Sequence, residues 1–262
     1  MRNSRILNTE ILFQLLVKYI KPEIICDIGT LDASHSILLR KISKQARIIA
    51  FEANLRNYEN IINRGLACKA NIEIIQKAVS NKPGQLVFHV QKYSDDEQDQ
   101  WMAGTSSILQ RNKEVGNTEE VSVESIRLDD YLNAEPPVSS SIALWIDVEG
   151  AGFEVLEGIQ NITKHISFLQ VEVETEEIWQ GQKLKKDIQS LMQAYGFLEV
   201  GRGKHEHQHD LVYINQSYFN NNRTKCNALV SLAVFFYYLR KWGGHILSNI
   251  MLIPFLGIWR RQ

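Results

Sequence analysis

The 262-residue sequence predicts an α/β fold built on a mainly parallel β-sheet. Short apolar runs alternate with segments of helical periodicity from residue 23 to residue 196. Strands that alternate with helices need crossover connections, and these place the strands parallel to one another. The last two apolar runs, residues 196–203 and 209–216, have no helical segment between them, so they predict a terminal antiparallel hairpin.

The predicted elements follow one another in a regular order. Asn8 or Thr9 caps an amphipathic helix over residues 8–20, which ends before Pro22. Two runs that alternate between apolar and polar residues, 84–90 and 119–126, predict half-exposed strands. Buried strands are expected at 23–28, 46–53, 71–80, 141–150 and 166–174, and helices at 34–43, 54–65, 151–165 and 183–196.

Charge divides the chain into an acidic body over residues 1–218 and a basic, apolar tail over residues 219–262. No acid follows Asp210, and the six Lys and Arg residues beyond it leave 23 basic against 30 acidic residues before it. The tail holds two apolar segments of 14 and 15 residues, shorter than the ~18–20 residues that span a bilayer as a helix. We therefore expect residues 223–262 to form helices that lie on an anionic membrane surface. The alternative is that these helices pack on the core or at a homodimer interface.

Composition also bears on compartment and partners. The net charge of −1 gives no electrostatic reason to expect nucleic acid as a partner. Three widely spaced cysteines form no disulfide or metal pattern and favour a reducing compartment. The first 20 residues interleave polar with apolar positions, unlike a signal peptide. We expect a cytoplasmic protein, with peripheral attachment to the inner face of the membrane if the tail binds lipid.

The stretch Ile24–Ile37, IICDIGTLDASHSI, follows the first buried strand and resembles a nucleotide loop with one glycine missing. Without a G-x-G-x-x-G spacing, a pyrophosphate cradle and a nicotinamide-dependent oxidoreductase are disfavoured. A nucleoside with an amino-acid arm needs only one close backbone approach, which Gly29 allows. Glu52 ends the second strand, where an acid can accept hydrogen bonds from both ribose hydroxyls. An ordinary turn and a solvated acid are the alternatives.

Several segments together resemble the FkbM family of S-adenosylmethionine-dependent methyltransferases. The resemblance spans about residues 24–216 and departs from the family's motifs at Leu31, Ala33, Trp145 and Gly152, where Asn, Gly, Lys and Glu are usual. The segments that carry it are DIGTLDASHSILL, IIAFEAN, GTSSI, IRLDDYL and LWIDVEGAGFEVLEG.

The resemblance implies a Rossmann-like class I methyltransferase: a mainly parallel seven-stranded sheet with a terminal antiparallel hairpin, plus a C-terminal apolar helical extension. It also implies S-adenosylmethionine as the cofactor. Asp27 and Gly29 would hold its amino-acid part, with Ala33 narrowing the loop, and Glu52 would hold its ribose. The backbone around Ala78 and Val79 would flank its adenine.

Catalysis is assigned by resemblance to Asp147 and Glu149 at the end of the fourth core strand. One carboxylate would orient the acceptor hydroxyl while the other accepts its proton; alternatively, Glu149 caps the next helix and Asp147 orders the loop. No metal is required, because the sulfonium leaves as a neutral thioether. Ser106 and Ser107, within a polar loop over residues 94–117, and His35 are candidate substrate contacts, or else surface residues.

His205, His207 and His209 would share one face of an extended strand. They could form a zinc or copper site, a basic substrate patch or a solvated hairpin tip. The expected function is O-methyl transfer to a hydroxyl of a small-molecule or glycan acceptor, such as a sugar or related metabolite. The alternative is a methyltransferase-like binding module with weakened catalysis, which the changes at Leu31 and Gly152 suggest.

Overall fold

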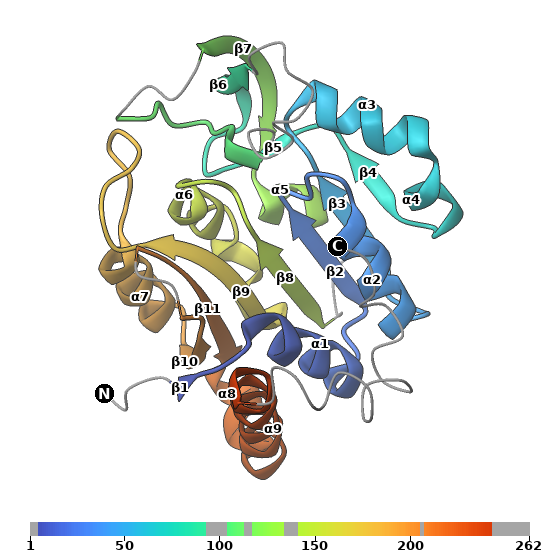
Figure 1. The fold of residues 1–262 in the computed structure, drawn as a ribbon, viewed down its shortest axis with the longest axis vertical. Helices are drawn as coiled ribbons and strands as arrows, with labels where there is room; N and C mark the ends of the chain where they lie inside the picture. Colours follow the sequence, from blue (N-terminus) through green and yellow to red (C-terminus); the bar gives the residue numbers. More distant parts are fainter. Residues whose placement is uncertain (1–4, 93–103, 113–116, 134–140, 205–206, 243–262) are drawn as a thin grey trace.

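The computed structural model describes residues 5–92, 104–112, 117–133, 141–204 and 207–242. A β-sheet forms the middle layer and helices cover both of its faces (Figure 1). The sheet has the strand order β1-β10-β11-β9-β8-β2-β3-β4. Its strands are β1 (Arg5–Ile6), β2 (Ile24–Ile28), β3 (Arg47–Phe51), β4 (Glu73–Ile75), β8 (Ile142–Ile146), β9 (Ile166–Glu174), β10 (Phe197–Arg202) and β11 (Gln208–Asn215).

The predicted parallel sheet with a terminal hairpin is confirmed. Strands β4, β3, β2, β8 and β9 are parallel neighbours, and β11 pairs antiparallel with both β9 and β10. The count of seven strands was too low by one, because the two-residue strand β1 adds a parallel partner to β10. This segment was too short to show any periodicity in the sequence.

Two apolar cores lie on opposite faces of this sheet, and neighbouring residues of one strand enter different cores. On β2, Ile25 enters one core, whereas Ile24 and Cys26 enter the other. The first core is covered by α1 (Thr9–Ile20), α2 (Ser34–Ile42), α3 (Leu55–Arg64), α4 (Leu66–Lys69) and α9 (Arg223–Trp242). The second is covered by α5 (Leu128–Asn133), α6 (Gly152–Glu157), the 3₁₀ helix η2 (Gln160–His165) and α7 (Lys185–Ala194).

Local sequence signals explain where the helices begin and end. The side chain of Asn8 accepts a hydrogen bond from the amide of Ile11 and caps α1, as expected. Asn54 caps α3 in the same way, and Gly65 ends that helix in a left-handed conformation that glycine adopts without steric cost. A short helix, α8 (Gln216–Asn221), is capped by the Asn215 side chain and leads into α9.

A second sheet stands beside the first and has the order β5-β7-β6. The long antiparallel pair β6 (Gly84–Lys92) and β7 (Asn117–Ile126) confirms the two half-exposed strands. The prediction of a single strand over residues 71–80 is wrong. It is divided at Gln76 and Lys77, so that β4 joins the large sheet and β5 (Ala78–Val79) joins the small one.

The first half of the basic tail packs on the body of the protein. Helix α9 contributes Cys226, Leu229, Val230 and Ala233 to the core that α1 also covers. The second apolar segment of the tail, and His205, lie outside the described residues. Among the helices that the structure describes, none combines the length and the apolar character needed to cross a membrane.

Candidate functional site

The loop after β2 is organised from beneath by Asp27. Its carboxylate accepts hydrogen bonds from the hydroxyls of Thr30 (2.7 Å) and Ser36 (2.6 Å). Burial raises the pKa of Asp27, but the neighbouring His35 ring and the hydrogen bonds from Ser36 and Thr30 outweigh it and leave this pKa below its ordinary value. Asp27 does not line the pocket described below but supports its loop, and its contact with the amino-acid part of the cofactor stays a prediction.

Gly29 lines the pocket, but the backbone of the neighbouring loop gives a stronger reason why this position must be a glycine. Gly29 has a φ of 84°, and a Cβ at this position would overlap the backbone carbonyl of Asp147. The absence of a side chain therefore lets the loops after β2 and β8 pack together. The sequence had suggested instead that a ligand required this close approach.

Leu31 and Ala33 both adopt left-handed backbone conformations, with φ of 56° and 61°. These are the two positions at which the resembled family usually has Asn and Gly, the residue types that tolerate this region best. The loop therefore has left-handed backbone at both positions, although neither Leu nor Ala is a residue type that favours it. Leu31 lines the pocket, whereas Ala33 is buried under it at the start of α2.

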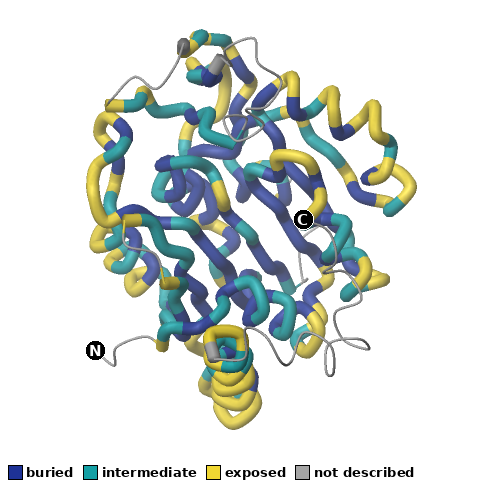
Figure 2. Tube along the Cα trace, viewed as in Figure 1, coloured by how far each residue is buried: buried dark blue, intermediate teal, exposed yellow. Residues whose placement is uncertain are grey.

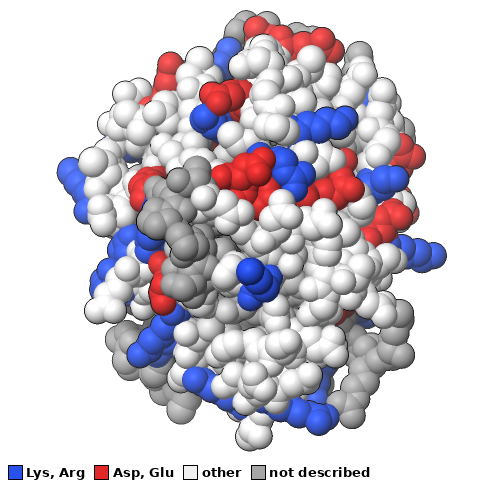
Figure 3. Space-filling model, turned by 180° about the vertical axis from the view of Figure 1, so that it is seen from behind, with Lys and Arg blue, Asp and Glu red and all other residues white. Residues whose placement is uncertain are grey.

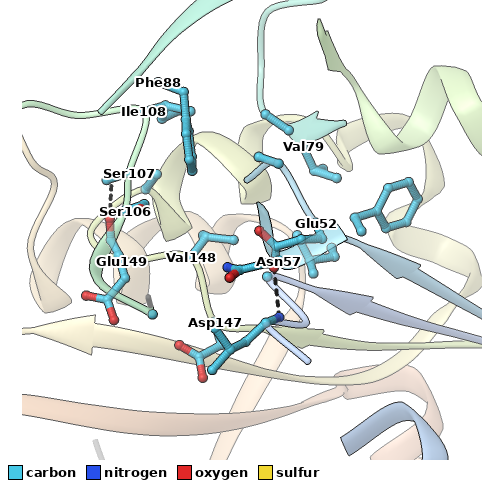
Figure 4. Close-up of a pocket in the computed structure, with 18 of the residues that line it drawn as sticks. Glu52, Asn57, Val79, Phe88, Ser106, Ser107, Ile108, Asp147, Val148 and Glu149 are labelled. Atoms are coloured by element: carbon cyan, nitrogen blue, oxygen red, sulfur yellow. Dashed lines mark hydrogen bonds between the residues drawn. The ribbon is translucent and has the colours of Figure 1, made fainter. Parts of the chain in front are cut away.

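Glu52 is a buried acid that faces the pocket (Figure 4). Its two carboxylate oxygens accept 2.8 Å hydrogen bonds from the backbone amides of Leu31 and Asn54. Burial raises the pKa of Glu52 to about 7, although these bonds and one from Asn57 act in the opposite direction. A carboxylate offers about four lone-pair sites, so with these three bonds it still has capacity to accept a hydrogen bond from a ribose.

The pocket extends from Glu52 between the two sheets and encloses about 590 Å³, including its open mouth. Figure 4 shows apolar side chains on one side and carboxylates on the other. The apolar side is formed by Phe51, Ala78, Val79, Phe88 and Ile108.

Asp147 and Glu149 line the opposite end of the pocket, so the structure brings them together with Glu52 and Val79. Part of the Asp147 side chain is open to the cleft. The protein packed around its carboxyl nevertheless removes solvation and, with the charge of Asp210, raises its pKa to about 6. Burial, followed by the charges of Asp147 and Glu174, raises the pKa of Glu149 to about 8.

Strand pairing brings two further acids to this end of the pocket. Ile146 of β8 is paired with Val171 of β9, and the residues that directly follow them are Asp147 and Glu172. Glu172 is also paired in register with Asp210 of the neighbouring strand β11. Carboxylate oxygens of Asp147, Glu149 and Glu172 lie within 4.8 Å of one another. Burial, with the charge of Asp147, raises the pKa of Glu172. Three carboxylates this close therefore share protons near neutral pH.

The sequence did not identify Glu172 or Asp210 as site residues. The alternating VEVE of β9 did show that Glu172 and Glu174 share one face of the strand. Which residue of β11 meets that face depends on the pairing register, and this depends on the turn before β11. The register is thus the information that a single sequence lacked.

The segment over residues 104–112, which begins with GTSSI, crosses above the pocket from the small sheet to the loop after β9. The amide of His89 donates a hydrogen bond to the carbonyl of Ser107, and the Ser107 hydroxyl donates one of 2.6 Å to the carbonyl of Glu149. Farther along, Arg111 forms an isolated bridge with Trp179, and its guanidinium lies over the indole ring at 5.3 Å. We call residues 104–112 the strap.

The strap places the two candidate serines differently. Ser107 is buried and contacts the turn that carries Glu149, and the Ser106 hydroxyl faces Gln91 and Asn54 at 3.3 and 3.5 Å. Both line the pocket. The rest of the 94–117 loop, apart from the strap, lies outside the described residues, except for Asn117 at the start of β7.

Trp179 explains the glycine of the IDVEG segment. The indole lies where a Cβ of Gly150 would be, and Gly150 has a φ of 77°. Gly152, two residues on, faces Val171 and the carbonyl of Glu172 rather than the pocket. The missing polar side chain at Gly152 therefore leaves no gap in the pocket wall.

The histidines are divided between different surroundings. His35 packs against Trp145, with ring centroids 3.8 Å apart, and its Nδ1 lies 3.8 Å from a carboxylate oxygen of Asp27. It does not line the pocket. His207 is paired with Glu176 at 3.3 Å, while His209 lies half-buried in β11, paired in register with Val173.

The sheet order, the acid after the second core strand and the pocket at the carboxyl ends of the strands define a Rossmann-like class I methyltransferase. The apolar wall suits an adenine, Glu52 suits a ribose, and the carboxylates suit a cationic sulfonium and ammonium. The residues present therefore fit S-adenosylmethionine, which is the cofactor of this class.

Comparison with known proteins identifies the family. The methyltransferase FkbM domain matches residues 27–199, and the chain belongs to this family. The 2-O-methyltransferase NoeI of Sinorhizobium fredii is 25% identical over 188 residues, which cover 67% of this chain and 73% of that protein.

Solved structures with a similar fold include two methylases, each 12% identical to this chain. The precorrin-6y C5,15-methyltransferase of Geobacter metallireducens GS-15 has a TM-score of 0.41, with 79% of this chain and 85% of that chain covered. An rRNA methylase of Streptococcus thermophilus has a TM-score of 0.43, with 82% and 99% covered.

Proposed function

We propose that the protein transfers a methyl group from S-adenosylmethionine to a hydroxyl of a sugar, a glycan or a related metabolite. The observation that carries this proposal is the group of carboxylates with raised pKa values beside the cofactor pocket. A hydroxyl nucleophile must lose its proton, and a carboxylate with a pKa near the working pH is suited to accept it. The similarity to a protein named as a 2-O-methyltransferase supports oxygen as the acceptor atom.

The different pKa values divide the roles of the two candidate acids. With a pKa of about 6, Asp147 is ionised near neutral pH and can accept the proton of the acceptor hydroxyl. With a pKa of about 8, Glu149 is mostly protonated at pH 7 and can donate a hydrogen bond that orients the acceptor. Glu172 shares its proton with Asp147 and keeps that carboxylate available as the base. The three groups titrate as one set.

The remaining pocket residues would bind the cofactor. Glu52 would accept hydrogen bonds from the ribose, and Val79, Phe88 and Ile108 would enclose the adenine. When bound, S-adenosylmethionine supplies an electrophilic methyl group on a positively charged sulfur. Holding an acceptor oxygen in line with that methyl group is the main task of the site, since orientation can contribute about 7–11 kcal/mol.

The charge of the site also limits the acceptor. Five acids, Asp147, Glu149, Glu172, Glu174 and Asp210, act electrostatically on one another at this end of the pocket. A phosphate or sulfate beside the reacting hydroxyl would be repelled. A neutral, polyhydroxylated acceptor, or one that carries an amine, is the class that fits.

No observation favours the alternative of a binding module without turnover. Leu31 and Ala33 keep the left-handed conformations of the loop, and Gly152 faces away from the pocket. The acids that the reaction needs are present and adjacent.

The test separates binding from turnover in Asp147→Asn, Glu149→Gln and, as a matched control, Glu59→Gln on the exposed face of α3. Calorimetry would measure S-adenosylmethionine binding, and transfer of a labelled methyl group would be measured over neutral, amino and phosphorylated sugars. We expect both site variants to bind cofactor, with Asp147→Asn at least 100-fold slower in transfer. Full turnover in both would refute the assignment, and loss of activity in EDTA would show that a cation, not a shared proton, offsets the carboxylates.

A further inference from the structure

Helix α9 has apolar residues on two opposite sides. One side, with Cys226, Leu229, Val230 and Ala233, is buried in the core beside α1. On the other side, Leu232, Phe235 and Tyr238 are 36%, 56% and 49% exposed. Figure 2 shows the outward side of this helix as exposed along the lower end of the molecule.

The exposed residues form a continuous stripe, which we call the outer stripe. Ala228, Leu232 and Phe235 are spaced four and three residues apart, so their side chains lie one above another along the helix. Tyr238 continues the row by a further turn. Tyr19, at the end of α1 and 43% exposed, lies beside α9, because Lys225 donates a hydrogen bond to its carbonyl.

Basic residues frame the outer stripe. Arg223 and Lys225 lie at the start of α9 and Lys241 at its end, and neither α8 nor α9 contains an acid. Arg5 adds a further cation, since its guanidinium donates a hydrogen bond to Ser231 of α9. On the face shown in Figure 3, acids gather in the upper half, while the lowest part shows only basic and uncharged residues.

We propose that the outer stripe of α9 lies in the interfacial region of an anionic lipid bilayer, with the helix parallel to the surface. An apolar stripe flanked by cations is the pattern that binds such a surface: the apolar side chains enter the acyl boundary and the cations contact lipid headgroups. A helix of 20 residues is about 30 Å long, so both basic ends reach headgroups when it lies flat. This proposal does not depend on the identity of the methyl acceptor.

Charge decides between the bilayer and the other occupants. A second copy of the chain would bring the same cations against Arg223, Lys225 and Lys241, and like charges would face each other across a two-fold axis. Anionic headgroups complement the same cations. The sequence beyond Trp242 adds Arg260 and Arg261 and no acid, which further favours an anionic surface.

The experiment is co-sedimentation of the full-length protein with vesicles of phosphatidylcholine alone or with 30% phosphatidylglycerol, at low and high salt. We expect binding to the anionic vesicles and at least tenfold weaker binding to the neutral ones. Leu232→Ser/Phe235→Ser should weaken binding at least tenfold, and Arg223→Gln should weaken it about fivefold. Leu198→Ser, at an exposed leucine of β10, is the matched control and should not change binding. Circular dichroism and cofactor binding would show that each variant is folded.

Three outcomes would overturn the proposal. Equal binding to both kinds of vesicle, or no binding, would exclude an anionic surface as the partner. Unchanged binding of Leu232→Ser/Phe235→Ser would exclude the outer stripe as the contact. A dimer in light scattering that the same double variant dissolves, without vesicle binding, would identify a second copy as the occupant.

Discussion

The hydroxyl of Ser107 donates a 2.6 Å hydrogen bond to the backbone carbonyl of Glu149. It joins the strap to the turn that carries the candidate catalytic acids. Glu149 needs this support, because it has a φ of 21°, which residues with a side chain rarely adopt. We therefore expect Ser107 to position this turn, whereas the sequence had suggested a substrate contact or a plain loop residue.

Replacing Ser107 with alanine should lower the free energy of unfolding by about 0.5–1.5 kcal/mol, because the half-buried carbonyl of Glu149 loses its hydroxyl donor. It should lower kcat more than cofactor affinity, because the acids move while Glu52 does not. Ser122→Ala is the control, since this exposed hydroxyl of β7 donates its hydrogen bond to the Gln85 side chain of β6. An equal loss of kcat in both variants would contradict a specific role for Ser107.

Glu52 should determine cofactor affinity. Glu52→Gln removes the charge and leaves only one acceptor oxygen for the amides of Leu31 and Asn54 and for the ribose. We expect the Kd for S-adenosylhomocysteine to rise at least tenfold, which corresponds to about 1.4 kcal/mol. Calorimetry would measure this, with Glu59→Gln on α3 as the control. An unchanged Kd would show that the ribose binds elsewhere.

Leu31→Asn should make the protein more stable. Leu31 has a φ of 56° and is 40% exposed, so the substitution relieves left-handed strain and removes little buried surface. The expected gain in the free energy of unfolding is about 0.5–1 kcal/mol, because asparagine tolerates this conformation better. Denaturant unfolding would measure it, and Leu55→Asn at an exposed helical position should show no gain. A loss of stability in Leu31→Asn would mean that the leucine packs more tightly than its exposure indicates.

Stability should depend on pH through the buried acids. Burial raises the pKa of Glu149 to about 8 and that of Glu174 to about 7, above the ordinary value of 4.5 expected in the unfolded chain. Between these values the folded protein binds more protons than the unfolded one, so its stability falls as pH rises from about 4.5 to 8. Thermal unfolding of the cofactor-free protein should show this fall. Glu149→Gln should have a shallower profile than the wild type, and parallel profiles would contradict the shift.

The sequence predicted the sheet well because its strands are continuous apolar runs bounded by polar residues. Strand β2, for example, is buried at all five positions. It also predicted that Glu52, Asp147 and Glu149 would meet, since the carboxyl ends of neighbouring parallel strands lie at one edge. Both predictions depend only on periodicity and on the order of the elements.

What the sequence could not give was the direction of single side chains. Asp27 lies at the last but one position of β2 and Asp147 directly follows β8, but Asp27 is buried beneath its loop, where it bonds to Thr30 and Ser36. Glu172 and Asp210 meet through the register between β9 and β11. The strap reaches Glu149 from a separate sheet whose position relative to the first has no local signal in the chain.

The position of the pocket between two sheets has a thermodynamic consequence. Glu52 follows β3 of the large sheet, whereas Ala78 and Val79 form β5 of the small one. A nucleoside held by both would act as a non-covalent cross-link between two structural units that otherwise pair their strands separately. Ligand would then raise the melting temperature of the small sheet as much as that of the large one, and would make the two unfold as a single cooperative unit.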